Sequence, residues 1–471
     1  MTNAASQSAQ PSGIASQRCI NPSCGASFSI GERVYTCTRC SGPLEIATPL
    51  PPVSEASALR ARWRTRAASL DPRDRSGVWR FREVLPFDAA APIVTLGEGN
   101  TPLYDAPRCA QYSGVLELRL KHQGCNPTGS FKDTGMTTAV TQALVLGART
   151  VVCASTGNTS ASLAAYSARA GVQCAILLPR GQITSSKLAQ SMDYGAIVCE
   201  IEGNFDDCMR LIQEIADDPS IYLANSINPF RMEGQKTVAY ELMEQCEWRV
   251  PDHVIVPGGN MGNSSALGKG FDELHRMGLI DRLPKLSVIQ AEGSAPLAHL
   301  FASLELASAK DESSCLEALA PVEKPQTLAT AIKIGTPVSW KKALRSVLRS
   351  HGCIIAVSEQ EIADAKAMIG RDGIGCEPAS ATTVAGIRKL TAAGFIRREE
   401  SVVAVLTGHL LKDPDYVSSY HRGTLSLESK AEDGTVALLP IRGAFRNAPI
   451  QVAASKNSIL EQLRRKNPKT L

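Results

Sequence analysis

Two hydrophobic patterns alternate along the chain from about Ile93 onward. Longer amphipathic stretches predict helices, such as Thr134–Leu146 and an alanine-rich segment that ends at Ala170. Short apolar runs rich in β-branched residues predict strands: Val115–Leu120, Thr150–Ala154, Gln173–Leu178, Ile197–Ile201, His253–Val256, Leu286–Ala291 and Ser401–Leu406. Alternation of this kind predicts a largely parallel α/β sheet, which binds ligands at the carboxyl ends of its strands.

Changes in pattern along the chain suggest four regions. We expect residues 1–50 to hold a disordered N-terminus and a small cysteine module, and residues 51–92 to form a linker and arm. Residues 93–420 form the α/β domain, with a smaller subdomain at about 135–245, and residues 421–471 form a polar tail. The stretch from Leu300 to Pro325 is rich in Ala, Glu, Ser and Lys and predicts a surface insertion.

Composition narrows the range of partners. A hydrophobic content of 44% supports a sizeable core, and a net charge of +4 gives no reason to expect nucleic acid or an anionic membrane. Met1 to Gln17 lack the apolar core of a secretory signal, and no window approaches the ~18 apolar residues that span a bilayer. We therefore expect a cytoplasmic protein.

Four early cysteines have the spacing of a metal site. The first pair is C-x4-C and the second C-x2-C, and two such turns supply the thiolates of a tetrahedral zinc site; they are Cys19, Cys24, Cys37 and Cys40. Short strands are predicted at Val34-Tyr35-Thr36 and Leu44-Glu45-Ile46, which together give the layout of a zinc ribbon. The alternatives are a degenerate ribbon without metal, or a nucleic-acid binder, for which a dense Lys/Arg run is lacking.

One lysine lies where a Gly/Pro-shaped loop enters a helix. The segment reads Asn126-Pro-Thr-Gly-Ser-Phe-Lys132-Asp-Thr-Gly135. A lysine at such a junction can be partly desolvated, which lowers its pKa and frees the amine for Schiff-base chemistry. A lone lysine is usually only surface charge, so the neighbouring motifs decide this case.

Two further loops follow predicted strands and open helices. Ala154-Ser-Thr-Gly-Asn-Thr-Ser160 offers hydroxyls and backbone N–H groups to a carboxylate, although helix capping explains one hydroxyl equally well. Pro257-Gly-Gly-Asn-Met-Gly-Asn263 can wrap an anion, although many strand–helix turns need glycine. It is neither a Walker loop nor G-x-G-x-x-G, so ATP and NAD are disfavoured.

These motifs, in this order, resemble the threonine synthases among the tryptophan-synthase-β-like, fold type II enzymes that use pyridoxal 5′-phosphate (PLP). The resemblance runs from about Trp79 to Pro414. Besides the lysine motif it includes Thr95-Leu-Gly-Glu-Gly-Asn-Thr-Pro-Leu103, Asn225-Ser-Ile-Asn-Pro-Phe-Arg-Met-Glu-Gly-Gln-Lys236, Gly375-Cys-Glu-Pro-Ala-Ser-Ala381 and Leu406-Thr-Gly-His-Leu-Leu-Lys-Asp-Pro414. It implies two open twisted α/β subdomains with the coenzyme between them, preceded by the ribbon.

The resemblance also implies a role for each matching residue. Lys132 would carry the coenzyme, Asn158 would bind its 3′-oxygen, and Thr407 would face its pyridine nitrogen, where a neutral hydroxyl does not enforce protonation as a carboxylate would. The 5′-phosphate would lie against Gly258, Gly259, Asn260, Met261, Gly262 and Asn263. The substrate's α-carboxylate would be held by Ser155, Thr156 and Thr159, and its phosphate by Ser226 and Arg231.

The activity implied by the resemblance is conversion of O-phospho-L-homoserine and water to L-threonine and phosphate. Another fold type II lyase, such as a threonine dehydratase or a cysteine-, cysteate- or diaminopropionate-forming enzyme, is the nearest alternative, and a non-catalytic PLP-binding regulatory protein is a second. The chain departs from the family at Thr134, Leu410 and Gln123. A homodimer is expected because dimers are common in such folds.

Overall fold

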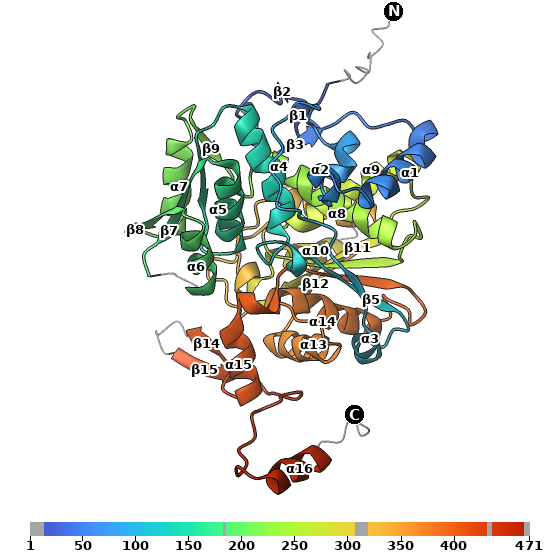
Figure 1. Cartoon of the computed structure of the whole chain (residues 1–471), viewed down its shortest axis with the longest axis vertical. Helices are drawn as coiled ribbons and strands as arrows, with labels where there is room; N and C mark the ends of the chain where they lie inside the picture. Colours follow the sequence, from blue (N-terminus) through green and yellow to red (C-terminus); the bar gives the residue numbers. More distant parts are fainter. Residues whose placement is uncertain (1–13, 182–184, 307–318, 431–435, 466–471) are drawn as a thin grey trace, which may run out of the picture. The chain divides into compact units, whose positions relative to one another are not determined.

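The computed structural model describes residues 14–181, 185–306, 319–430 and 436–465 (Figure 1). Its contacts divide the chain into two units, Met1–Asp413 and Pro414–Leu471. The predicted disordered start falls largely on residues 1–13, which lie outside the described residues. The predicted insertion at Leu300 to Pro325 is described only in part, because residues 307–318 also lie outside the described residues. The beginning of that insertion is the end of helix α10 (Pro296–Leu306).

A four-stranded parallel sheet forms one half of the first unit. Its order is β8 (Ile197–Ile201), β7 (Gln173–Pro179), β6 (Thr150–Ala154) and β9 (Ile221–Leu223). Helices cover it: α4 (Lys132–Val145), α5 (Asn158–Ala170), α6 (Ser185–Asp193) and α7 (Phe205–Ile215). The central strand β6 has helices on both faces, which is why its sequence is a continuous apolar run.

A six-stranded sheet forms the other half. Its order is β12 (Ile354–Val357), β11 (Lys285–Ala291), β10 (His253–Pro257), β13 (Val402–Leu406), β5 (Leu118–His122) and β4 (Leu103–Asp105), and only β4 is antiparallel to its neighbour. The helices packed around it are α3 (Pro107–Ser113), α8 (Pro229–Gln245), α9 (Gly262–Arg276), α12 (Trp340–Arg349), α13 (Glu359–Arg371) and α14 (Pro378–Ala392).

The predicted parallel α/β architecture is therefore confirmed. Thr150–Ala154 and Ile197–Ile201 are strands with the predicted bounds, whereas the strand expected from Val115 begins at Leu118. The strands β9 and β12 were not predicted. They are three and four residues long, which is too short for an apolar run to stand out.

The cysteine module is a three-stranded antiparallel sheet in the order β2 (Ser27–Ser29), β1 (Ser16–Cys19), β3 (Leu44–Ala47). The strand predicted at Leu44-Glu45-Ile46 is confirmed. The one predicted at Val34-Tyr35-Thr36 is wrong, since only Thr36 forms a bridge, to Pro43. The Tyr35 side chain instead reaches β9, where its hydroxyl accepts a hydrogen bond from the backbone N–H of Leu223 at 2.9 Å.

Side chains fasten this module to both halves of the first unit. Arg33 donates to the carbonyl oxygen of Leu146 at the end of α4, at 2.8 Å. On the other side, Lys269 of α9 donates to the Ile46 carbonyl and Lys342 of α12 donates to the Leu44 carbonyl. The module therefore contacts helices that belong to different sheets.

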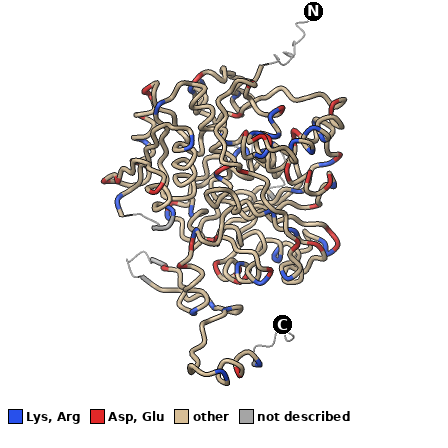
Figure 2. Tube along the Cα trace, viewed as in Figure 1, with Lys and Arg blue, Asp and Glu red and all other residues tan. Residues whose placement is uncertain are grey.

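The arm that follows the module packs through aromatic rings. Trp63 of α1 (Ala56–Ala67) is fully buried, and its ring lies 5.1 Å from that of Phe81 and 5.7 Å from that of Tyr240, centroid to centroid. Arg66, in the basic run of α1, forms an ion pair with Glu83 at 2.6 Å. Figure 2 shows Lys and Arg interspersed with Asp and Glu along the chain.

The second unit contains α15 (Pro414–Arg422), an antiparallel pair formed by β14 (Ser426–Lys430) and β15 (Val436–Pro440), and α16 (Lys456–Arg465). The Tyr420 hydroxyl accepts a hydrogen bond from the backbone N–H of Phe445 at 3.2 Å. Among the described residues of either unit, no helix combines the length and hydropathy needed to cross a membrane.

Candidate active site

The carboxyl ends of strands from both sheets carry the predicted site residues. The backbone N–H of Phe131 donates to the carbonyl oxygen of Thr407 at 2.9 Å, and Ser130 forms a bridge with Gly408. The start of α4, which bears Lys132, is thus tied to the residues that follow β13. Lys132 and Thr407 are 275 positions apart in the sequence, and the fold brings their backbones together.

The amine of Lys132 lies over the Phe131 ring, with Nζ 3.8 Å from the centroid. In the part of the chain that the structure describes, no carboxylate lies within ion-pair distance of it. Burial and, to a smaller extent, the nearby charge of Arg231 together lower the pKa of Lys132 to about 7, while Glu377 acts in the opposite direction. A lysine with this pKa has a neutral, nucleophilic amine near neutral pH.

Asp133 holds the lysine loop in shape. Its carboxyl group accepts hydrogen bonds from the Thr128 backbone N–H at 2.7 Å and from the hydroxyls of Thr128 and Ser162, each at 2.6 Å. Burial raises the pKa of Asp133 to about 6 in spite of these donors. Because Ser162 belongs to α5, this carboxyl group connects the lysine motif to the helix that begins at Asn158.

Asn158 and Thr407 meet at a residue for which no role was predicted. The buried carboxylate of Glu377 accepts a hydrogen bond from Asn158 Nδ2 and another from Thr407 Oγ1, each at 3.0 Å. Glu377 precedes α14 and belongs to the motif Gly375–Ala381. The sequence thus singled out the motif but not the role of this residue. One acidic side chain therefore joins Asn158 and Thr407, and its charge also acts on the amine of Lys132.

The glycine-rich turn after β10 needs its glycines. A Cβ added at Gly258 would lie 2.6 Å from Val288 Cγ1, and one at Gly259 would lie 3.0 Å from Ile332 Cγ2. Met261 has φ 63°, a left-handed conformation that is rare for such a side chain, and α9 begins directly after it. Helical N–H groups of α9 thus follow the turn, as in other anion sites.

The two asparagines of this turn have different surroundings. Asn260 Oδ1 accepts a hydrogen bond from the Val338 backbone N–H at 2.6 Å, so this side chain also holds a neighbouring loop. Asn263 Nδ2 donates to Gln123 Oε1 at 3.2 Å, while its Oδ1 is buried and finds no hydrogen-bond partner among the residues that the structure describes. Gln123, one of the three departures from the family, therefore supports the turn.

Close helix packing connects the lysine helix to this turn. A Cβ added at Gly234 of α8 would overlap the carbonyl oxygen of Thr134 in α4. The Gln235 side chain lies beside Gly135 of α4, and its Oε1 is 3.8 Å from the position of a Cβ on Gly262. The backbone carbonyl of Thr134, one of the three departures from the family, therefore leaves no room for a side chain at Gly234.

Arg231 is a buried cation without a counter-charge. It is 3% exposed, and its Nη1 lies 3.2 Å from the Ala224 carbonyl oxygen and 3.5 Å from Ser226 Oγ. Its Nε has no hydrogen-bond partner within the described part of the chain. No carboxylate among the described residues lies within 4.0 Å of it, and burial lowers its pKa to about 10. An unpaired buried charge is costly, so this arrangement indicates a site for an anion.

The hydroxyls predicted to bind a carboxylate share the loop between β6 and α5. Ser155 Oγ accepts a hydrogen bond from the Gly157 backbone N–H at 3.1 Å, and Thr159 is buried in the first turn of α5. Thr156 lies between them. The residue at the N-cap of α5 is Gly157, and no side chain caps the helix there, so helix capping does not account for these hydroxyls.

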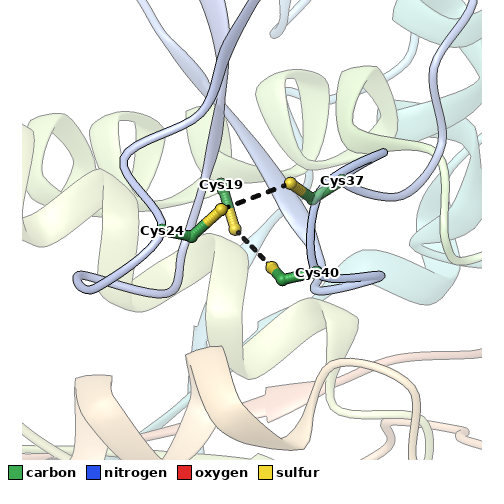
Figure 3. A group of neighbouring side chains, drawn as sticks. All are labelled: Cys19, Cys24, Cys37 and Cys40. Carbon is green, nitrogen blue, oxygen red and sulfur yellow. Dashed lines mark hydrogen bonds between the residues drawn. The ribbon is translucent and has the colours of Figure 1, made fainter.

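The four cysteines converge at one point of the module (Figure 3). All four sulfurs lie within 4.8 Å of one another, with Cys19 and Cys40 3.5 Å apart and Cys24 and Cys37 3.6 Å apart. Sulfurs ~2.3 Å from a tetrahedral metal are ~3.8 Å from one another, whereas a disulfide needs ~2 Å. The cluster therefore has the chemistry and spacing of a metal site.

Comparison with known proteins agrees with this site. A model of the family "Pyridoxal-phosphate dependent enzyme" matches residues 94–408. The chain is 48% identical over 400 residues to the threonine synthase of Methanocaldococcus jannaschii, covering 85% of this chain and 93% of that one. It is 46% identical over 337 residues to that of Mycobacterium leprae, covering 71% and 88%.

Solved structures show the same fold. A fungal L-serine ammonia-lyase from Rhizomucor miehei matches with a TM-score of 0.58 and 20% identity, covering 69% of this chain and 99% of that one. Diaminopropionate ammonia lyase from Escherichia coli matches with a TM-score of 0.56 and 15% identity, covering 78% and 92%. The chain belongs to the pyridoxal-phosphate dependent enzymes of fold type II and, within them, to the threonine synthase family.

Proposed function

We propose that this chain converts O-phospho-L-homoserine and water to L-threonine and phosphate, with its PLP on Lys132. The observation that carries the choice of substrate is Arg231, because a buried guanidinium beside Ser226 and without a carboxylate suits a phosphorylated substrate. Membership of the threonine synthase family supports the same reaction.

The residues present fit the coenzyme. Lys132 supplies an amine whose pKa is lowered to about 7. Asn263 and Asn158 each have a buried side-chain oxygen that accepts no hydrogen bond from the described residues. In our proposal the turn from Gly258 to Asn263 holds the 5′-phosphate, and Asn158 and Thr407 bind the ring. When bound, the coenzyme supplies an electron sink for a carbanion at the substrate's Cα.

The chain's own groups position the substrate and move its protons. Ser155, Thr156 and Thr159 bind the α-carboxylate, while Arg231 and Ser226 bind the phosphate, so the two ends of the substrate fix its middle. The amine of Lys132 takes the proton from Cα and moves protons at Cβ. The phosphate leaves from Cγ, and the oxygen of water adds at Cβ.

Phosphate release, measured together with ammonia release, from purified protein tests this proposal. We expect turnover of O-phospho-L-homoserine, with little or none of L-threonine or O-phospho-L-serine, which the alternative lyases would use. Lys132→Ala should remove both the visible absorbance of the bound coenzyme and the turnover. Lys389→Ala, on an exposed helix position, is the matched control and should leave both unchanged. Turnover that persists in Lys132→Ala would refute the assignment, and absorbance without turnover in the wild type would favour a regulatory protein.

We also propose that the four-cysteine cluster binds one structural Zn²⁺. Its thiolates and their spacing support tetrahedral coordination without an open position for chemistry. We expect the purified protein to contain one zinc ion per chain, and we expect the Cys24→Ser variant and the Cys37→Ser variant each to lose it. A cytoplasmic location and a homodimer remain proposals, which fractionation and sedimentation would test.

A further inference from the structure

A single carboxylate holds the two residues that are proposed to bind the coenzyme ring. Glu377 is 1% exposed, and its two oxygens accept from different partners, Oε2 from Asn158 Nδ2 and Oε1 from Thr407 Oγ1. A carboxylate can only accept hydrogen bonds, so both partners must donate to it. Each partner therefore has a defined orientation before any ligand is considered.

The hydroxyl of Thr407 can only accept, and not donate, a further hydrogen bond. Ser380 Oγ accepts from the backbone N–H groups of Thr407 at 2.8 Å and Gly408 at 3.2 Å, which occupies both of its lone pairs. The Ser380 hydroxyl hydrogen must therefore point to Thr407 Oγ1, 3.0 Å away. Since Thr407 gives its own hydrogen to Glu377, one lone pair remains on Thr407 Oγ1.

The amide of Asn158 is oriented by the same carboxylate. With Nδ2 donating to Glu377, Oδ1 is directed elsewhere, and this oxygen is buried without a hydrogen-bond partner among the described residues. A buried unpaired acceptor is costly unless a bound group supplies a donor. Asn158 and Thr407 thus each have an unused acceptor.

The position of Glu377 leaves little room for another arrangement. Its backbone N–H donates to the Gly408 carbonyl oxygen at 3.0 Å. A Cβ at Gly408 would overlap the Glu377 carboxyl group. A glycine at this position is therefore needed for the carboxylate to reach both partners.

We infer that Glu377 is a positioning residue: it directs the hydrogen bonds of Thr407 so that its hydroxyl offers an acceptor to the pyridine nitrogen, and it fixes the Asn158 amide so that the second N–H of Nδ2 is left for the coenzyme's 3′-oxygen. A pyridine nitrogen facing the lone pair of Thr407 is then stabilised in its protonated form. The resemblance alone implied only that a neutral hydroxyl does not enforce protonation as a carboxylate would. The inference rests on the proposed function, since it assumes that the ring lies at Thr407.

Nitrogen NMR of bound PLP labelled at the pyridine nitrogen tests this inference. In the wild type the nitrogen should carry a proton. In Glu377→Gln, the amide can accept from only one of the two partners and donates to the other, so the apparent pKa of the pyridine nitrogen should fall by about one unit or more. Thr407→Val should lower it as well, and the double variant should add little beyond the larger single effect. Glu359→Gln, a partly buried glutamate on α13, is the matched control and should change nothing.

The outcomes separate this inference from the proposed function. A wild type that binds no PLP at Lys132 refutes both. A wild type that binds PLP, with an unchanged nitrogen signal in Glu377→Gln, overturns only the role of Glu377. If Glu377→Gln does not fold, Thr407→Val tests the orientation of the Thr407 hydroxyl instead. If that hydroxyl accepts a hydrogen bond from the pyridine nitrogen, its loss lowers the pKa of the nitrogen; if it donates one, its loss raises this pKa and overturns the inference.

Discussion

The pKa of Lys132 makes a quantitative prediction for uptake of the coenzyme. Burial and Arg231 lower this pKa from 10.5 to about 7. At pH 7 about half of the amines are then neutral, whereas an ordinary lysine would be roughly 0.03% neutral, a difference of about 1,600-fold. Only the neutral amine attacks the coenzyme aldehyde. The second-order rate of uptake should therefore rise about tenfold per pH unit below 7 and level off above pH ~8.

Stopped-flow absorbance of coenzyme-free protein mixed with PLP measures this rate. The coenzyme has its own ionisations, so the decisive comparison is between variants at the same pH. Replacing Arg231 with methionine removes a positive charge, and the midpoint should move to higher pH. Lys187 also lowers the pKa and Glu377 raises it, so both stay unchanged in this experiment. A midpoint near 10.5 in the wild type, or one that Arg231→Met moves downward, would refute the reasoning.

Three further predictions concern stability and packing. Glu241→Gln should cost about 3–5 kcal/mol in urea unfolding because it leaves the fully buried ammonium of Lys121 without its counter-charge, and a loss below about 1 kcal/mol would contradict this. Gly234→Ala should destabilise the fold and raise KM for the phosphorylated substrate, because the added methyl group separates α4 from α8. The control Gly370→Ala, in open space on α13, should stabilise the fold by up to about 1 kcal/mol. Equal effects of the two substitutions on stability would show that the contact between α4 and α8 is unimportant. Treatment with a metal chelator, or Cys37→Ser, should lower Tm, and an unchanged Tm in both would show that the cluster does not stabilise the fold through a metal.

Local sequence patterns were sufficient for most of the fold. The apolar run at Thr150–Ala154 and the spacing of the cysteines each depend on neighbours along the chain, and both predictions agree with the structure. The predicted strand at Val34–Thr36 failed because Tyr35 packs on β9, a partner 188 positions away that no local pattern reveals. Short strands such as β12 were missed for a similar reason, since the sheet stabilises them more than their own composition does.

The site was predictable as a set of motifs but not as a network. Lys132, Asn158 and Thr407 were each assigned by resemblance, and the structure brings them together. The place of Glu377 among them could not be deduced, because a glutamate before a proline in a helix start is normally only a favourable charge near the helix N-terminus. The sequence likewise could not show that Arg231 lacks a counter-charge, because only the tertiary structure of the described residues shows that no carboxylate lies near its guanidinium.

The attachment of the cysteine module limits how the protein can be shortened. Lys342 is buried, and its ammonium is directed at the Leu44 carbonyl, while Lys269 donates to the Ile46 carbonyl. A truncated version starting after residue 50 would remove one acceptor from each ammonium group and uncover the sides of α9 and α12 that carry them. Anyone seeking a minimal enzyme should therefore keep β3, or replace Lys342 with an apolar residue in the same design.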